Sequence, residues 1–264
     1  MTFNLEDALR KRKPAFIPYL MAGDPDLATT EAMVRVLAAN GAAALELGVP
    51  YGDPLADGPT IAAAAQRALA RGTKVVHVLA LAKRVSEAIP VVLFTYLNPI
   101  YRYGLERFAA DAAAAGVAGV IVPDVTLEEL DSIASVFEER AVAMPLLVAP
   151  TTPAQRAAEI ARRSSGFVYV VSRLGVTGAN SAPNVEALRA QVERLRRATN
   201  LPLAVGFGIR SQDQVAAIAT FADAFIVGSA LIDAYGSARS ADAVASVEML
   251  ARELTHAVGG RRSI

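Results

Sequence analysis

Short apolar runs that recur along the whole chain are the feature that most constrains its fold. Each run is four to eight residues long, and its apolar residues follow one another instead of alternating with polar ones. A strand that is apolar on both sides is covered on both faces, which is typical of parallel sheets. The sequence therefore predicts eight buried parallel strands, at residues 16–21, 42–49, 91–96, 119–124, 145–149, 167–172, 203–207 and 224–227.

Stretches with the helical spacing of apolar residues separate these strands. Eight such strand–helix units in a chain of 264 residues are what a closed (β/α)8 barrel requires. We therefore predict an α/β fold, a TIM barrel that forms a single domain over residues 1–264. Its main helices are predicted at 26–39, 75–87, 105–115, 127–140, 153–164, 185–199, 211–220 and 241–257.

Two shorter helices are expected outside this repeat. A helix at residues 4–12, with Leu5 and Leu9 on one face, is expected to plug one end of the barrel. A short helix at 229–235 is expected before the last barrel helix. A doubly wound open sheet is the alternative, but residues 23–25 after the first strand read Gly-Asp-Pro, which is not the glycine-rich fingerprint of that fold.

Composition excludes several classes of function. The net charge is zero and no basic stripe is present, which argues against nucleic-acid binding. The chain has no cysteine, and neither His77 nor His256 has a second ligand at metal spacing, so no metal site is expected. The longest apolar run, at 112–123, is too short to span a bilayer, and the first residues lack the apolar core of a signal peptide. We therefore expect a cytoplasmic protein that does not enter a membrane.

Two carboxylates around the second predicted strand are the first candidates for catalysis. Glu46 interrupts an apolar run, where a charge is expensive to bury, and Asp57 follows in a loop held between prolines. A buried Glu near a second carboxylate can both give and take a proton near neutral pH. The alternative is that Glu46 ends a strand and simply points to solvent.

Further polar residues fall at the ends of other predicted strands, where the catalytic groups of such barrels lie. Tyr96 and Asn98 end the third strand, Asp124 ends the fourth, and Tyr169 lies in the sixth. Loop capping is an equally good interpretation of Asn98 and Asp124, because Asn and Asp favour turns. Tyr169 is equally well explained as a core residue with a paired hydroxyl.

Glycine-rich loops follow the last three predicted strands. They read Gly-Val-Thr-Gly at 175–178, Gly-Phe-Gly-Ile at 206–209 and Gly-Ser-Ala at 228–230. Glycine lets backbone N–H groups approach an anion, and many barrels hold a phosphate after strands seven and eight. We predict a phosphate site here, bound by backbone amides and a helix dipole without a Lys or Arg.

The space between the carboxylates and the phosphate loops is predicted to be apolar and partly aromatic, which suits a flat ring. From the residues alone we infer acid–base chemistry on a phosphorylated substrate with an apolar end, without a metal. The inner strand residues expected to line this space are Tyr19, Phe94, Ile121, Val148 and Tyr169.

These motifs resemble the alpha subunit family of tryptophan synthase. The resemblance is carried by Leu-Glu-Leu-Gly-Val-Pro at 45–50 and by Asp-Pro-Leu-Ala-Asp-Gly-Pro at 53–59, and it covers essentially the whole chain. It implies a carbon–carbon lyase that cleaves indole-3-glycerol phosphate to indole and glyceraldehyde 3-phosphate. Further matching motifs are Gly-Asp-Pro at 23–25, Val-Pro-Asp at 122–124, Ser-Arg at 172–173 and the glycine-rich loops at 175–178 and 205–209.

The resemblance also implies roles for individual residues. Glu46 would protonate C3 of the indole and help deprotonate the glycerol hydroxyl. Asp57 would accept a hydrogen bond from the indole N–H and stabilise the developing positive charge. Tyr169 would line the indole pocket near Glu46, together with Thr177. The positions matching the phosphate site are Gly178, Phe207, Gly208, Gly228 and Ser229. The loops at 51–61 and 178–185 would be mobile lids that close over the substrate.

The family further implies a partner. A beta subunit that carries pyridoxal phosphate (PLP) would receive the indole and join it to serine in an α2β2 heterotetramer, while this chain would hold no cofactor of its own. The loop after the second strand and the segment 98–99 would lie at that interface. Two alternatives remain, namely a stand-alone lyase that releases free indole, and a catalytically silent barrel that binds phosphorylated ligands.

Overall fold

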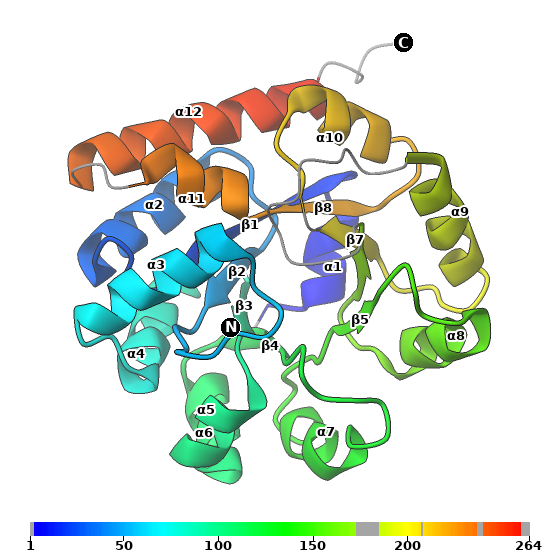
Figure 1. Cartoon of the computed structure of the whole chain (residues 1–264), viewed down its shortest axis with the longest axis horizontal. Helices are drawn as coiled ribbons and strands as arrows, with labels where there is room; N and C mark the ends of the chain where they lie inside the picture. The colour runs from blue at the N-terminus through cyan, green and yellow to red at the C-terminus, as the bar shows by residue number, and fades with distance from the viewer. Residues whose placement is uncertain (1–2, 173–184, 207, 237–239, 260–264) are drawn as a thin grey trace.

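The computed structural model of the chain describes residues 3–172, 185–206, 208–236 and 240–259. Parallel strands form one eight-stranded sheet in the order β4-β3-β2-β1-β8-β7-β6-β5. Figure 1 shows these strands surrounded by helices. The strands are β1 Ala15–Met21, β2 Leu45–Gly48, β3 Val91–Phe94, β4 Val117–Ile121, β5 Leu146–Val148, β6 Val168–Val171, β7 Leu203–Gly206 and β8 Ala224–Val227.

The two edges of this sheet meet through the residue segment that precedes β5. Gly119 of β4 forms a parallel bridge with Ala143. The Val120 N–H donates to the Ala143 carbonyl at 2.8 Å, and the Ala143 N–H donates to the Ala118 carbonyl at 3.0 Å. The predicted barrel is confirmed, and its strands are buried on both faces, apart from the partly buried Leu146, Leu147 and Val171.

The helices cover the outside of the barrel, and α1 lies at one end of it. A Cβ built on Gly166 would lie 2.9 Å from the side chain of Leu5, so the buried face of α1 packs against this glycine. The helices are α1 Leu5–Arg10, α2 Leu27–Ala39, α3 Pro59–Ala70, α4 Val75–Val85, α5 Leu97–Tyr103, α6 Leu105–Ala114, α7 Asp131–Glu138, α8 Ala154–Arg163, α9 Val185–Arg196, α10 Gln212–Ile218, α11 Ser229–Tyr235 and α12 Ser240–Gly259.

Two helices beside the candidate site were not predicted. The sequence predicts a loop at residues 51–61 and places Asn98 at the end of the third strand, yet α3 begins at Pro59 and α5 contains Asn98. Pro59 occupies the first turn of α3, where its missing N–H costs nothing. Leu97 begins α5 because the Asp124 carboxylate accepts its N–H at 3.0 and 3.2 Å.

The predicted short helix before the last barrel helix is present as α11. The predicted cap of α10 is also present, since Ser211 and Gln214 bind each other's backbone N–H groups in a capping box. Helix α7 is shorter than expected and begins at Asp131, after a loop of turns at its predicted start. No helix in the described part of the chain has the length and apolar composition that crossing a membrane requires.

Candidate active site

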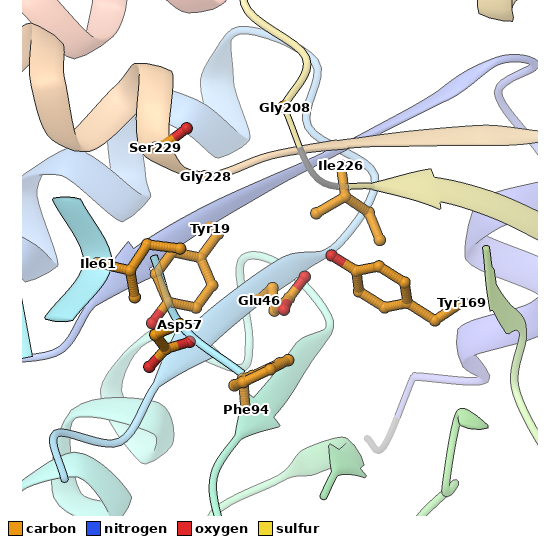
Figure 2. A pocket seen from close by; sticks show the side chains of 10 residues that line it. All are labelled: Tyr19, Glu46, Asp57, Ile61, Phe94, Tyr169, Gly208, Ile226, Gly228 and Ser229. Carbon is orange, nitrogen blue, oxygen red and sulfur yellow. The ribbon is translucent and has the colours of Figure 1, made fainter. Parts of the chain in front are cut away.

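The two predicted ends of the ligand site open into one pocket of about 380 Å³. Figure 2 shows Gly208, Gly228 and Ser229 along one side of the pocket and Glu46, Asp57 and Phe94 toward the other. The lining residues are Tyr19, Glu46, Asp57, Ile61, Phe94, Tyr169, Gly208, Ile226, Gly228 and Ser229.

Glu46 is a buried carboxyl group on β2, and its side chain is 2% exposed. Among the described residues its Oε2 atom finds no hydrogen-bond partner. Burial, and secondarily the charge of Asp57, raise the pKa of Glu46 to about 8. Glu46 therefore holds a proton at neutral pH and presents a free oxygen in the pocket, which excludes the solvent-facing alternative.

Asp57 lies in the loop between β2 and α3 and is the second carboxyl group of the pocket. Burial raises its pKa to about 6, and a hydrogen bond with the Tyr96 hydroxyl acts in the opposite direction. The Tyr96 oxygen also accepts the Ala56 N–H at 3.1 Å, so it holds the loop at two successive residues, Ala56 and Asp57. At neutral pH Asp57 is therefore mostly ionised while Glu46 is mostly protonated.

Tyr169 enters the pocket from β6 with its hydroxyl toward Glu46, as Figure 2 shows. Burial, followed by the charges of Glu46 and Asp57, raises the pKa of this tyrosine well above its ordinary value, so it stays a neutral phenol. A Cβ built on Gly206 would lie 2.3 Å from the Tyr169 oxygen. The glycine on the neighbouring strand therefore makes the room that this ring occupies.

Tyr19 and Phe94 form the apolar wall that the sequence predicted. Their rings meet edge to face, with centroids 6.1 Å apart and planes at 84°. A Cβ on Gly48 would lie 2.2 Å from the Tyr19 oxygen, so this ring, too, depends on a glycine. Ile61 and Ile226 also line the pocket, although no pattern in the sequence predicted this. Ile226 lies in a predicted strand, but the strand pattern does not indicate to which face its side chain points.

Ile121 and Val148 were both predicted to line the pocket. Ile121 is fully buried and pairs with Phe94, but it is not among the described residues that line the pocket. Val148 is likewise not among the described residues that line the pocket. In the parallel register Leu147, not Val148, pairs with Tyr169, so successive side chains put Val148 on the other face. Val148 lines a separate cavity with residues of α8 and α9, including Ala157 and Gln191.

Gly208, Gly228 and Ser229 form the predicted phosphate side of the pocket, and Ser229 begins α11. Gly178 and Phe207, which belong to the same prediction, and Thr177, which was predicted for the indole pocket, lie outside the described residues. The expectation that no Lys or Arg lies here is wrong. Arg210 places its Nη2 3.4 Å from the Ser229 Oγ. The signal was present in the sequence, because this cation follows directly on the 206–209 motif.

Other polar candidates from the sequence serve local structure. Asp124 caps α5, and the Asn98 amide donates to the Tyr51 hydroxyl at 3.0 Å. His77 accepts the Lys74 N–H with its Nδ1 at the start of α4. Within the described ranges, no group of three or more His, Cys, Asp or Glu side chains is arranged to hold a metal ion.

Comparisons with known proteins agree with this geometry. The family model described as tryptophan synthase alpha chain matches residues 5–259. The chain is 46% identical to the tryptophan synthase alpha chain of Synechocystis sp. over 258 residues, which cover 96% of this chain and 97% of the relative. A protein of the same name from Caulobacter vibrioides is 46% identical over 257 residues, covering 96% and 93% of the two chains.

Solved structures are similar over the same length. A chain from the structure of Mycobacterium tuberculosis tryptophan synthase superimposes with a TM-score of 0.89 at 38% identity, covering 98% of this chain and 99% of that one. The tryptophan synthase alpha chain from Legionella pneumophila gives a TM-score of 0.87 at 34% identity, with 99% of both chains covered.

Proposed function

The chain belongs to the tryptophan synthase alpha chain family, and from this premise we propose how its own residues carry out the lyase reaction, the cleavage of indole-3-glycerol phosphate. The comparisons confirm the family that the motifs predicted. The reaction yields indole and glyceraldehyde 3-phosphate. Its proton transfers and its charge stabilisation are assigned to residues of the pocket.

Glu46 is proposed as the general acid and then the general base. Its proton goes to C3 of the indole, where the pair of electrons of the C2–C3 double bond forms the new C–H bond and leaves positive charge on the ring nitrogen. The ionised Glu46 then takes the proton of the glycerol hydroxyl next to C3. The carbon–carbon bond breaks, its electrons restore the aromatic indole, and the hydroxyl carbon becomes the aldehyde. One carboxyl group with a raised pKa suits both steps.

Asp57 is proposed to stabilise the charge that develops on the indole. Its carboxylate would accept a hydrogen bond from the ring N–H, and this bond strengthens as the nitrogen becomes positive. An ionised carboxylate in a partly buried site has a strong effect on such a charge because little water screens it. The Tyr96 hydroxyl holds Asp57 in its ionised form and is proposed as a positioning residue.

The rest of the pocket is proposed to bind the two ends of the substrate. The rings of Tyr19, Phe94 and Tyr169 would contact the flat indole, whereas Gly208, Gly228 and Ser229 would bind the phosphate through backbone N–H groups and a hydroxyl. Phosphate binding is also predicted for Gly178 and Phe207, and contact with the indole for Thr177.

The single observation that carries this proposal is the buried Glu46 Oε2, which has no hydrogen-bond partner among the described residues, in a pocket that also contains Asp57. A buried polar atom without a partner costs free energy, and a site for a proton acceptor or donor on the substrate explains that cost. A carboxyl group with a purely structural role would have its partners inside the protein.

The test is the cleavage of indole-3-glycerol phosphate by the pure chain, followed as indole release. Glu46→Gln should lower kcat by about 10²- to 10⁴-fold, since it removes the acid and the base but keeps the shape. Glu128→Gln, a change at an exposed surface carboxylate, is the matched control. Undiminished turnover in the Glu46 variant would remove this mechanism and favour the catalytically silent alternative.

We also propose that the indole passes to a beta subunit, so that an α2β2 assembly makes tryptophan with PLP bound only on the partner. Leu55, in the loop before α3, is 73% exposed, and Tyr101, on α5, is 53% exposed, although both side chains are large and apolar. The hydrogen bond between Asn98 and Tyr51 joins their two segments. Exposed apolar side chains that gather in this way are typical of protein interfaces. The predicted cytoplasmic location belongs to the same proposal.

Titration with a beta subunit of the family tests the assembly. The partner should increase indole-3-glycerol phosphate cleavage, and Leu55→Ser should weaken this activation. Met249→Ser, on the outer helix α12 and 69% exposed, should leave it unchanged. Full turnover by the chain alone, unaffected by the partner, would support the stand-alone lyase instead.

A further inference from the structure

A cation lies at the rim of the pocket where the sequence predicted none. Arg210 sits between β7 and α10, two residues after Gly208. Its Nη2 is 3.4 Å from the Ser229 Oγ, and its Nη1 is 2.7 Å from the Asp233 Oδ2. Ser229 is only 6% exposed and lines the pocket together with Gly208 and Gly228. The half-exposed guanidinium therefore contacts Ser229, a buried residue of the pocket lining.

The ion pair between Arg210 and Asp233 is not a sufficient reason for an arginine at this position. A pair between two half-exposed groups contributes little to stability, and here the side chains of Arg210 and Asp233 are 47% and 43% exposed. A guanidinium has five N–H donors in a planar fork, and contacts to Ser229 and Asp233 use only part of them. The remaining donors leave room for a planar, two-point contact with a second anion.

Asp233 is shared between Arg210 and the catalytic side of the pocket. Its Oδ1 accepts the hydroxyl of Thr60 at 3.1 Å, and Thr60 lies in the first turn of α3, three residues after Asp57. The carboxylate thus holds Arg210 near Ser229, but its negative charge also competes with any other anion for the guanidinium. Removing that charge while keeping the amide shape should release Arg210 to the second anion.

We propose, on the basis of the proposed function, that Arg210 is a specificity-determining residue that binds the phosphate group of the substrate beside Ser229. Its permanent charge would make the chain select a phosphate dianion over a neutral glycerol end. The backbone N–H groups at Gly208, Gly228 and Ser229 fix where the phosphate sits, and Arg210 supplies the net charge that they lack.

The test measures binding of glycerol 3-phosphate by calorimetry, and kcat and KM for indole-3-glycerol phosphate. Arg210→Gln should weaken glycerol 3-phosphate binding and raise KM by about fivefold, with kcat within about twofold, because a half-exposed cation interacts with an anion through partial solvent screening. The affinity and the KM of Arg210→Lys should lie between those of the wild type and of Arg210→Gln, since lysine keeps the charge but lacks the planar fork of donors. The wild-type affinity should also decrease more steeply with salt than that of Arg210→Gln.

Two controls separate a phosphate contact from a structural ion pair. Asp233→Asn should leave the affinity unchanged or increase it, whereas a structural pair would make Arg210→Gln and Asp233→Asn equally harmful. Arg189→Gln removes a charge at a distant surface site, where the guanidinium stacks 4.8 Å from the ring of Phe221, and should have no effect.

The outcomes also distinguish this inference from the proposed function. Wild-type affinity in the Arg210→Gln variant, or equal losses in the Arg210 and Asp233 variants, would overturn the role of Arg210 and leave the phosphate site intact. Failure of the wild-type chain to bind glycerol 3-phosphate or inorganic phosphate at all would overturn the proposed phosphate site, and the role of Arg210 with it.

Discussion

The two sides of the pocket are formed by different kinds of residue. The carboxylate side consists of buried side chains, Glu46 and Asp57, whose pKa values are raised by the loss of water around them. The opposite side consists of glycines, one serine and a half-exposed arginine. The first side suits proton transfer, which requires tuned side chains, and the second suits the recognition of a fixed charge.

This difference means that changes on the two sides should affect different kinetic constants. A group that acts only in the transition state changes kcat, whereas a group that binds substrate and transition state equally changes KM. Substitutions on the two sides test that division, beginning with the largest expected effect.

Asp57→Asn should lower kcat by about 10²- to 10³-fold, because an amide cannot offset the positive charge on the indole nitrogen. Ser229→Ala, on the opposite side, should raise KM by about tenfold with little change in kcat, since it removes one hydrogen bond to a charged group. Steady-state kinetics with indole-3-glycerol phosphate measures both. An equal loss of kcat in the two variants would contradict the division.

Gly206→Ala should destabilise the chain by about 1–3 kcal/mol, as expected where a new methyl group overlaps a packed ring. The new Cβ would lie 2.3 Å from the hydroxyl oxygen of Tyr169. Displacing Tyr169 should also lower kcat/KM. Gly52→Ala is the matched control, because no described residue other than its chain neighbours comes within 4 Å of its new Cβ. Thermal unfolding of both variants measures the difference, and equal Tm values would show that the Tyr169 ring is not held by this glycine.

The pH dependence of kcat/KM should have two limbs. Asp57 must be ionised, so activity should fall by about tenfold per pH unit below its pKa of about 6. Glu46 must be protonated, so activity should fall in the same way above its pKa of about 8. Tyr96→Phe removes the hydrogen bond that lowers the pKa of Asp57, and it should move only the acid limb, to higher pH. Movement of the alkaline limb alone would reverse the assignment of the two carboxyl groups.

The sequence by itself determined the architecture and the location of the site. Continuous apolar runs predict parallel strands because only a strand covered on both faces is apolar throughout. In such a barrel the polar residues that follow the strands gather at one end, and this brought Glu46, Asp57, Gly208, Gly228 and Ser229 to one pocket. These features depend on local pattern and on chain order, which the sequence contains directly.

The tertiary structure alone decided the contacts between segments that are distant in the chain. The pairing of Leu147 with Tyr169 turned Val148 away from the pocket, since a shift of one residue in a strand reverses the direction of its side chain. Asp124 begins α5 from 27 residues away, and Arg210 reaches Ser229 from 19 residues away. The raised pKa of Glu46 likewise comes from its burial in the barrel. Burial is a property of the folded chain, so the sequence alone could not give this pKa.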